Sequence, residues 1–230
     1  MKTKEKILEI LEQNKGSFVS SRILTEKINV SRNAIWKAVN DLRDSGYEID
    51  SVTNKGYMLL KTSDIISLQG IESYLIDKEK INMVAVFDEL QSTNMTAKID
   101  AISGVLNKKV IIAKHQTAGV AHGKQNYDSP RGGVYISIIK DPPKDKKQIK
   151  ASDIGKAVAD VIESQIDAEI SLDQKNNRIY LNGEKICGIM TEYIADLETG
   201  DISTYVIGIG IQLPGILKNR LIAALIDRLL

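Results

Sequence analysis

Cysteine is almost absent from the sequence. Cys187 is the single cysteine, so no disulfide can form within the chain and no zinc site built on several cysteines is possible. The chain has only 2 histidines, and no His, Cys and carboxylate residues show the spacing of a metal site. The low cysteine content is typical of a reducing compartment. We therefore predict a cytoplasmic protein without a metal.

Long apolar runs are also lacking. No stretch approaches the roughly 20 apolar residues that a membrane span needs. Residues 1–6 are charged and lead directly into a helical pattern, unlike a secretory signal peptide. The 230 residues, of which 43% are hydrophobic and 27% charged, are typical of a globular protein with two domains. We predict no membrane partner.

The net charge of the chain does not exclude a nucleic-acid partner. The net charge is +1, but residues 1–61 hold 11 Lys and Arg against 8 Asp and Glu, while the remainder is slightly acidic. This asymmetry permits nucleic-acid binding by the first part of the chain without establishing it.

The first sixty residues predict three helices and a hairpin. Thr3 is expected to cap a first helix that runs to about Asn14, and a second helix is expected to start at Ser20 or Ser21. Ser31 is a good N-cap for the third helix. Residues 47–60 predict two strands joined by a tight turn near Asn54–Gly56. This order is the plan of a winged helix-turn-helix, which we place at residues 1–62.

The third helix indicates a function. Its predicted buried stripe is Ala34, Ile35, Val39 and Leu42, and polar residues lie off that stripe. A helix of this kind fits the major groove of DNA, where side chains near its start reach base edges. We therefore predict that the domain binds a double-stranded DNA operator; a winged helix that binds protein is the alternative, and Trp36 could instead be a packing residue. The predicted DNA-contacting residues are Ser20, Ser21, Arg22, Ser31, Arg32, Asn33, Trp36, Lys37 and Lys55.

Residues 63–230 predict a second domain of the α+β class with a mainly antiparallel sheet. Asn182-Gly183 lies between two of its strands and is a strong hairpin signal. Helices are predicted at 65–76, 153–165 and 217–230. Strands are predicted at 85–87, 110–113, 135–139, 179–181, 189–194 and 205–211.

Five short motifs follow one another in this domain. They are Ser92-Thr-Asn94, His115-Gln-Thr-Ala-Gly119, Ser129-Pro-Arg-Gly-Gly133, Leu181-Asn-Gly-Glu-Lys-Ile-Cys-Gly-Ile-Met-Thr-Glu192 and Val206-Ile-Gly-Ile-Gly-Ile211. In this order and spacing they resemble the biotin protein ligase family. Nearly the whole chain resembles the bifunctional type, which joins the ligase to a winged-helix repressor.

The resemblance implies a chemistry and a site. Ligases of this family join biotin to the α-phosphate of ATP and pass it to a lysine of an acceptor protein. Some of the motif residues resemble the family's biotin-binding wall, which surrounds the ureido head of biotin. The polar atoms of that buried head need hydrogen-bond partners. Ser92 to Asn94 could also be a helix N-cap after a strand. The implied ligand-binding residues are Ser92, Thr93, Asn94, Gln116, Thr117, Gly119, Gly188 and Ile189.

Two cationic motifs of the family are altered. The arginine positions of its Gly-Arg-rich loop fall on Val120, His122 and Gln125, which leaves Lys124 as the only fixed charge in the loop. The lysine of the family's Lys-Trp-Pro-Asn-Asp motif falls on Gln174, or on Lys175 if one residue is inserted. Loss of one such donor reduces transition-state stabilisation by about 3 to 4 kcal/mol. We therefore expect adenylation to be lost or very weak, with no catalytic residue assigned and ATP binding in doubt.

The sequence thus predicts a transcription regulator whose ligase-like domain senses biotin and which acts as a homodimer, with no cofactor required. Two alternatives remain open: an active bifunctional ligase and repressor, and a regulator that senses a ligand other than biotin. After the amphipathic helix over 217–230 we expect no counterpart of the family's small C-terminal β-barrel.

Overall fold

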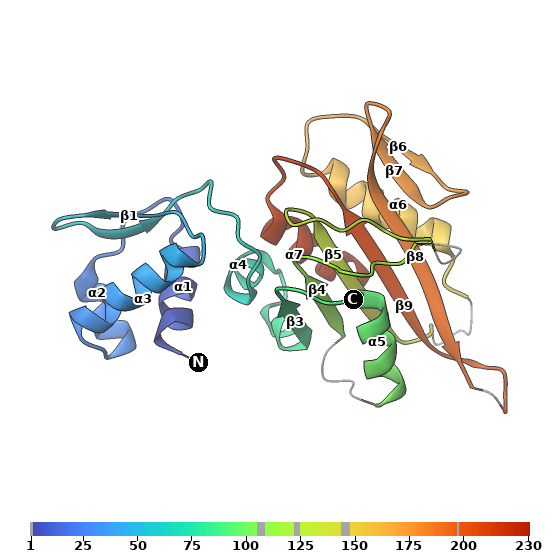
Figure 1. Cartoon of the computed structure of the whole chain (residues 1–230), viewed down its shortest axis with the longest axis horizontal. Coiled ribbons are helices and arrows are strands. Elements are labelled where there is room, and N and C mark those ends of the chain that lie inside the picture. Colours follow the sequence, from blue (N-terminus) through green and yellow to red (C-terminus); the bar gives the residue numbers. More distant parts are fainter. Residues whose placement is uncertain (1, 105–108, 122–124, 144–147, 197) are drawn as a thin grey trace. The chain divides into compact units, whose positions relative to one another are not determined.

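The computed structural model describes residues 2–104, 109–121, 125–143, 148–196 and 198–230. The chain divides into two compact units, residues 1–74 and residues 75–230. Figure 1 shows the elements of both. None of the helices within the described residues is long and apolar enough to cross a membrane.

The first unit is the predicted winged helix-turn-helix. Ser20 and Ser31 are the N-caps of the second and third helices, and each side chain accepts a 3.2 Å hydrogen bond from the backbone three residues later. The first helix differs from the prediction, because Lys2 and not Thr3 occupies its N-cap, where the Lys2 amide donates to the Glu5 carboxylate at 2.8 Å. The elements are α1 (Thr3–Gln13), α2 (Ser21–Ile28), α3 (Arg32–Asp44), β1 (Ile49–Val52) and β2 (Gly56–Leu59).

The core of this unit lies between the three helices. The buried residues of α3 are Ile35, Ala38, Val39 and Leu42, so Ala38 takes the place predicted for Ala34, which is only half-buried. The prediction differs from the structure in one position of the buried face. Ala38 lies three residues after Ile35 and four before Leu42, and therefore on the same helical face as both.

The hairpin turns where the sequence predicts. Asn54 and Gly56 both have positive φ, 66° and 100°. A Cβ at position 56 would lie 2.1 Å from the Val19 carbonyl oxygen, because the backbones of Val19 and Tyr57 exchange two hydrogen bonds there. Only glycine permits this contact, which ties the wing to the segment just before α2.

The segment after the wing also belongs to the first unit. The Ser63 hydroxyl is buried and accepts a 3.1 Å hydrogen bond from the Glu48 amide, and α4 (Leu68–Tyr74) contacts α1. The helix predicted over 65–76 is therefore shorter than expected. The sequence places the division after residue 62, and the two compact units divide twelve residues later.

The second unit has the predicted α+β architecture. Its seven strands run in the order β3-β4-β5-β9-β8-β7-β6, and every neighbouring pair except β3 and β4 is antiparallel. The strands are β3 (Val84–Phe87), β4 (Val110–Ala113), β5 (Val134–Lys140), β6 (Ile170–Asp173), β7 (Arg178–Leu181), β8 (Glu184–Ala195) and β9 (Ile202–Ile211). The helices are the 3-10 helix η1 (Lys78–Met83), α5 (Thr93–Ile102), α6 (Ala151–Glu163) and α7 (Lys218–Leu229).

Helices cover both faces of this sheet. α5 packs on β4, β5 and β9 through a buried cluster that includes Ala97, Ile111, Ile139 and Val206. α6 and α7 cover the other face (Figure 1). β5 lies inside the sheet, beside the central strand β9. It is buried along six of its seven residues, which matches its nearly continuous apolar sequence. The first turn of α5 thereby points its side chains at the middle of β5 and β9.

Candidate functional site

A polar network surrounds the first turn of α5. The Thr93 amide and hydroxyl both donate to Oε1 of Gln116, at 2.8 and 3.1 Å. Nε2 of Gln116 donates to the Ser129 hydroxyl at 2.8 Å, and that hydroxyl donates to the Tyr127 carbonyl. Ser92 lies behind them as the helix N-cap and accepts from the Met95 amide at 3.4 Å. The network fixes the orientation of the Gln116 amide.

Asn94 extends this network across the sheet. Its Oδ1 accepts a 2.5 Å hydrogen bond from the buried Ser137 hydroxyl of β5, and its Nδ2 donates to the Glu192 carboxylate at 3.0 Å. Lys98 pairs with the other oxygen of Glu192 at 2.9 Å. A Cβ at position 208 would lie 2.3 Å from Oδ1 of Asn94. Gly208 therefore makes the room that Asn94 needs.

Tyr127 lies on the glycine-rich part of β8 and β9. Its hydroxyl donates to the Gly210 carbonyl at 2.8 Å, and its ring lies 2.5 Å from the place of a Cβ at position 210 and 3.0 Å from that at 188. The Lys185 ammonium lies 4.9 Å from the ring centroid, within range of a cation–π interaction. Burial raises the pKa of Tyr127 and, together with the nearby Arg178 charge, lowers the pKa of Lys185.

These groups enclose one cavity of about 70 Å³. Small-molecule sites usually enclose roughly 300 Å³ or more, so a ligand of that size would extend out of this cavity or displace side chains that line it. One end of the cavity is polar, and glycines and Tyr127 form its floor. Two cationic side chains, Lys185 and Arg178, also line it. The lining residues are Thr93, Asn94, Gln116, Ala121, Tyr127, Asn176, Asn177, Arg178, Lys185, Gly188, Ile189, Met190, Gly208, Ile209 and Gly210.

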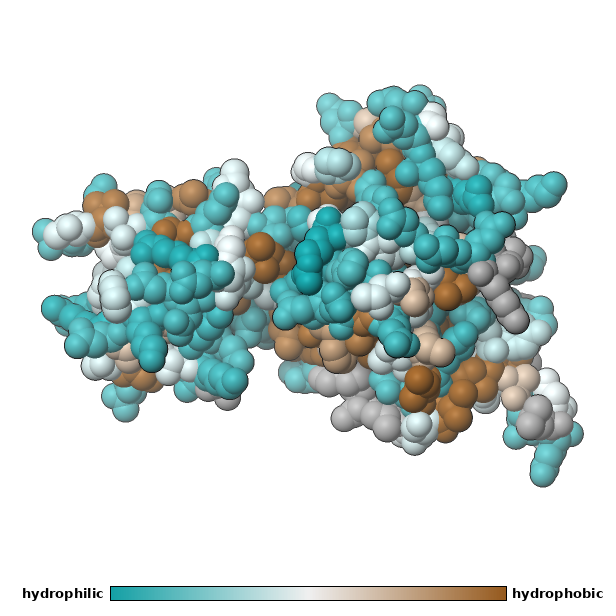
Figure 2. Space-filling model, in the orientation of Figure 1, coloured by the Kyte–Doolittle hydropathy of each residue, from teal (hydrophilic) through white to brown (hydrophobic). Residues whose placement is uncertain are grey.

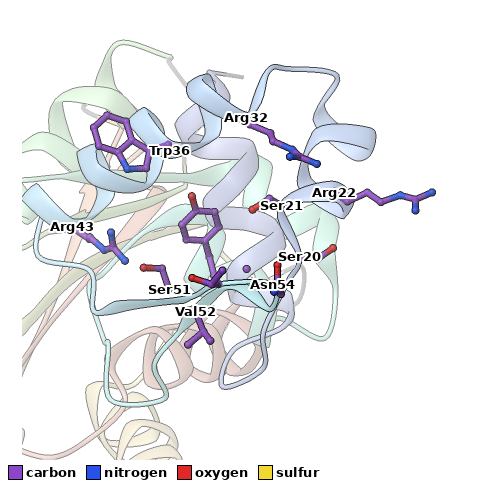
Figure 3. Close-up of a pocket in the computed structure, with 12 residues that line it drawn as sticks. Ser20, Ser21, Arg22, Arg32, Trp36, Arg43, Ser51, Val52 and Asn54 are labelled. Atoms are coloured by element: carbon purple, nitrogen blue, oxygen red, sulfur yellow. The ribbon is translucent and has the colours of Figure 1, made fainter.

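The first unit carries a separate groove of about 470 Å³ between the helix-turn-helix and the wing. Figure 3 shows Ser20, Ser21 and Arg22 on one side of it, Arg32 and Trp36 on α3, and Ser51, Val52 and Asn54 on the hairpin. Three arginines line it against no acidic residue among its lining residues. Such a surface attracts an anionic partner.

Comparison with known proteins assigns the second unit. Residues 86–212, more than half of the chain, match the Biotin/lipoate A/B protein ligase family, and residues 3–58 match an HTH domain. The chain belongs to the biotin/lipoate A/B protein ligase family. The predicted resemblance is thus confirmed, and so is the fold class.

Two relatives are similar to most of the chain. The Bifunctional ligase/repressor BirA of Bacillus subtilis is 32% identical over 90% of this chain, and that of Escherichia coli is 29% identical over 86%. The chain spans 63% and 60% of the length of these relatives. The biotin acetyl coenzyme A carboxylase synthetase of Helicobacter pylori, solved with biotinylated ATP, shares the fold with a TM-score of 0.52 at 21% identity, over 63% of this chain and 72% of that one.

The ligase-family cavity contains five of the eight predicted ligand residues. Thr93, Asn94, Gln116, Gly188 and Ile189 line it. The other three, Ser92, Thr117 and Gly119, do not. Ser92 is buried as the helix cap, and Thr117 is exposed. Gly119 lies behind the wall, where a Cβ would be 2.5 Å from the Tyr127 carbonyl oxygen.

The family's lysine position lies away from the cavity. Gln174 and Lys175 are both exposed and do not line it, whereas Asn176, Asn177 and Arg178 do. Of the altered arginine positions, Val120 and Gln125 are exposed and uncharged, and His122 and Lys124 lie outside the described residues. Arg178 therefore places a positive charge in the wall of the cavity, at the position where the family motif has a negatively charged aspartate.

Sequence reasoning missed two residues at the centre of the cavity. Lys185 belongs to a motif that was recognised, but only Gly188 and Ile189 of that motif were assigned to the ligand. Tyr127 stands two residues before Ser129-Pro130, another recognised motif, but its place in the cavity is set by contacts with the distant Gly188 and Gly210. In the described ranges, no group of three or more His, Cys, Asp and Glu residues is placed to hold a metal ion.

The groove of the HTH domain contains five of the nine predicted DNA residues, Ser20, Ser21, Arg22, Arg32 and Trp36. Ser31 acts as the cap of α3, and Asn33 and Lys37 are exposed beside the groove. The Lys55 ammonium lies 5.8 Å above the Phe18 ring at the turn of the wing. Arg43 was not predicted; its guanidinium donates two hydrogen bonds to the Ile49 carbonyl, at 3.0 and 2.8 Å, and so fixes the wing to α3.

Proposed function

We propose that this protein is a DNA-binding transcription regulator whose ligase-family unit binds biotin and adenylates it weakly or not at all. The observation that carries the proposal is the polar network of Thr93, Asn94 and Gln116 at one end of a cavity whose floor is glycine and aromatic. That division suits a ligand with a polar ring at one end and an apolar chain at the other.

The side-chain amides of Gln116 and Asn94 can each donate a further hydrogen bond to a ligand. The Gln116 amide uses one of its two N–H groups on Ser129, and the Asn94 amide uses one on Glu192; each amide carries two. A ureido carbonyl can accept from these remaining donors. Tyr127, Ile189 and Met190 provide apolar contact for the chain of the ligand, and Lys185 or Arg178 can pair with its carboxylate. Lipoate shares the chain and carboxylate but lacks the ureido group, so the network favours biotin.

The proposed weakness in adenylation rests on the loop after Gly119. Val120 and Gln125 carry no charge at positions where the family resemblance implies arginine. Phosphate groups that react within a site need positioned cations, and removing one typically lowers the rate by about 10² to 10³. Several such losses act together without adding simply. The nucleotide half of the site is therefore the part that we propose has degenerated.

A retained ligase activity is the second candidate, and one observation favours it. Lys185 and Arg178 both line the cavity, so two cations remain beside the place proposed for the carboxylate of biotin. Cations there reduce the repulsion between a carboxylate and a phosphate. Incubation with biotin and ATP, followed by mass spectrometry for biotinyl-AMP, decides between the candidates. Product formed in repeated turnovers would establish a ligase.

Calorimetric titration of the full chain with biotin, and separately with biotinyl-AMP, tests the main proposal. We expect tight binding of biotin and little gain from the adenylate. Binding of the adenylate alone would support the ligase. Binding of neither, in a chain that still binds DNA, would point to a regulator of another ligand. The matched variants are Gln116→Leu, which removes the donors, and Thr117→Val, which lies outside the cavity.

We further propose that the regulator acts as a homodimer on an operator with two half-sites, as symmetric repressors do. Biotin can shift such an assembly only as far as its affinities for monomer and dimer differ. Sedimentation velocity with and without biotin, and with and without operator DNA, measures that coupling. An unchanged monomer under all four conditions would contradict this part of the proposal.

A further inference from the structure

Trp36 is the only tryptophan of the chain, and it is 60% exposed. An indole has the largest apolar area of any side chain that could fill a core. The core face of α3 is nevertheless made by Ile35, Ala38, Val39 and Leu42, and Trp36 stands off that face. Trp36 is therefore not part of the buried core of the first unit.

The position of Trp36 places it in the middle of the proposed DNA surface. Arg32 lies one helical turn before it and Arg43 two turns after it, so the three side chains follow one face of α3. All three line the groove between α3 and the wing. Figure 3 shows the Trp36 ring and the Arg32 side chain projecting from the same helix above the hairpin residues.

Two arginines that line the same groove as Trp36 already have partners within the protein. Arg43 holds the Ile49 carbonyl, and Arg22 at the edge of the groove pairs with Glu26 at 2.7 Å. Charged groups at the edges suit phosphates, which carry no sequence information. Side chains near the start of a recognition helix reach base edges in the major groove, and there an apolar ring can contact the thymine 5-methyl group.

We propose that Trp36 contacts thymine methyl groups in the major groove and thereby sets the sequence preference of this regulator. The inference rests on the proposed DNA binding and adds the chemical feature that is read. It predicts an operator half-site with at least one thymine whose methyl group is required. Arg22 and Lys37, in contrast, are expected to contribute affinity without preference.

The test begins with selection of duplexes from a randomised pool by the full-length protein, followed by affinity measurements on the selected site. Each thymine is then replaced in turn by uracil, which removes only the methyl group. At one or more positions this replacement should weaken binding by about fivefold or more, the lower end of the loss caused by a wrong base pair. Unchanged affinity at every position would overturn the inference.

Trp36→Ala supplies the protein side of the test. The variant should lose the discrimination between thymine and uracil and approach the affinity of wild type for unselected DNA, while the salt dependence of binding, which counts phosphate contacts, stays the same. Tyr193→Ala, which removes an aromatic ring that is 62% exposed in the second unit, is the matched control. Discrimination that survives in Trp36→Ala would overturn the inference.

The two proposals fail in different ways. If the wild-type protein selects no duplex at all, DNA binding itself is wrong and the inference falls with it. If it selects a site but tolerates uracil throughout, DNA binding stands and only the role of Trp36 is wrong. The fluorescence of the single tryptophan gives an independent signal, because an indole buried against bases should lose its access to acrylamide on binding the selected site.

Discussion

The hydroxyl of Tyr127 donates to the carbonyl of Gly210 at 2.8 Å, and the ring fills the space in which any side chain at position 210 would begin. The two residues are far apart in the sequence, and each requires the other. Their contact makes the floor of the cavity in the ligase-family unit.

Gly210→Ala is therefore expected to abolish biotin binding and to lower the melting temperature. The new Cβ would lie 2.5 Å from a ring carbon of Tyr127, and both the ring and the central strand β9 would have to shift. Gly155→Ala is the control. It lies in α6 with its nearest neighbour at 3.5 Å, and it should raise stability by about 0.5 to 1 kcal/mol. Equal effects of the two variants would contradict this account of the floor.

Ser137 supports the polar wall from beneath. Its hydroxyl is fully buried, donates to Oδ1 of Asn94 at 2.5 Å and lies 2.8 Å from the Thr93 hydroxyl. Ser137→Ala removes the hydroxyl that donates to Oδ1 of Asn94, while the Thr93 hydroxyl keeps its bond to Gln116. The loss should reduce the free energy of unfolding by about 1 to 3 kcal/mol and weaken biotin binding. Denaturant unfolding and calorimetry measure the two effects. Ser203→Ala, at an exposed hydroxyl, should change neither.

Much of the fold could be predicted because its signals are local. The caps Ser20 and Ser31, the wing turn at Asn54 and the Asn182-Gly183 hairpin each depend on a few neighbouring residues, and all lie where the sequence places them. The strand β6 was missed because Ile170–Asp173 is short and only half-buried. Its pairing with β7 is what makes it a strand.

The site could be predicted only in part for a related reason. Thr93, Asn94 and Gln116 stand in recognisable motifs, whereas Tyr127 and Lys185 take their positions from contacts with residues that are distant in the chain. Nothing local indicates that Tyr127 lies on Gly188 and Gly210 or that Lys185 lies over its ring. The motif for the family's lysine pointed instead to Gln174, which lies outside the cavity.

Glu12 gives the first unit a pH dependence of known sign. It is 4% exposed, and its Oε1 has no hydrogen-bond partner within the described part of the chain. Burial raises its pKa above the ordinary value of 4.5, and pairing with Lys15 only partly offsets the effect. The pKa of Glu12 is higher in the folded state than in the unfolded state. The contribution of protonated Glu12 to the free energy of unfolding is therefore complete below pH 4.5 and is lost as the pH rises through the folded pKa.

Glu12→Gln is accordingly expected to make the first unit more stable than wild type at pH 7, with the difference shrinking as the pH falls toward 4.5. Unfolding of this unit can be followed by the fluorescence of Trp36 in the full chain. Glu9→Gln, which removes a half-exposed carboxylate from the same helix, controls for loss of a charge. A variant that is less stable than wild type at pH 7 would show that the ion pair with Lys15 outweighs burial.

Lys185 and Lys175 are two lysines whose contributions to ligand binding can be separated by substitution. Lys185 lines the cavity beside Tyr127, while Lys175 is exposed and outside it. Lys185→Met removes one of the two cations proposed for the carboxylate of biotin. It should therefore weaken biotin binding at least tenfold and abolish any residual formation of biotinyl-AMP. Lys175→Met should leave both unchanged.

The pH dependence of binding gives a second measurement of the same contact. Because burial and the Arg178 charge lower the pKa of Lys185, the ammonium loses its proton below the ordinary value of 10.5. Affinity for biotin should accordingly fall with rising pH before an ordinary lysine would titrate, and this fall should be absent in Lys185→Met. If Lys175→Met instead carries the loss of binding and of adenylate, the alignment with one inserted residue is correct and the cavity rearranges around that loop when ligand binds.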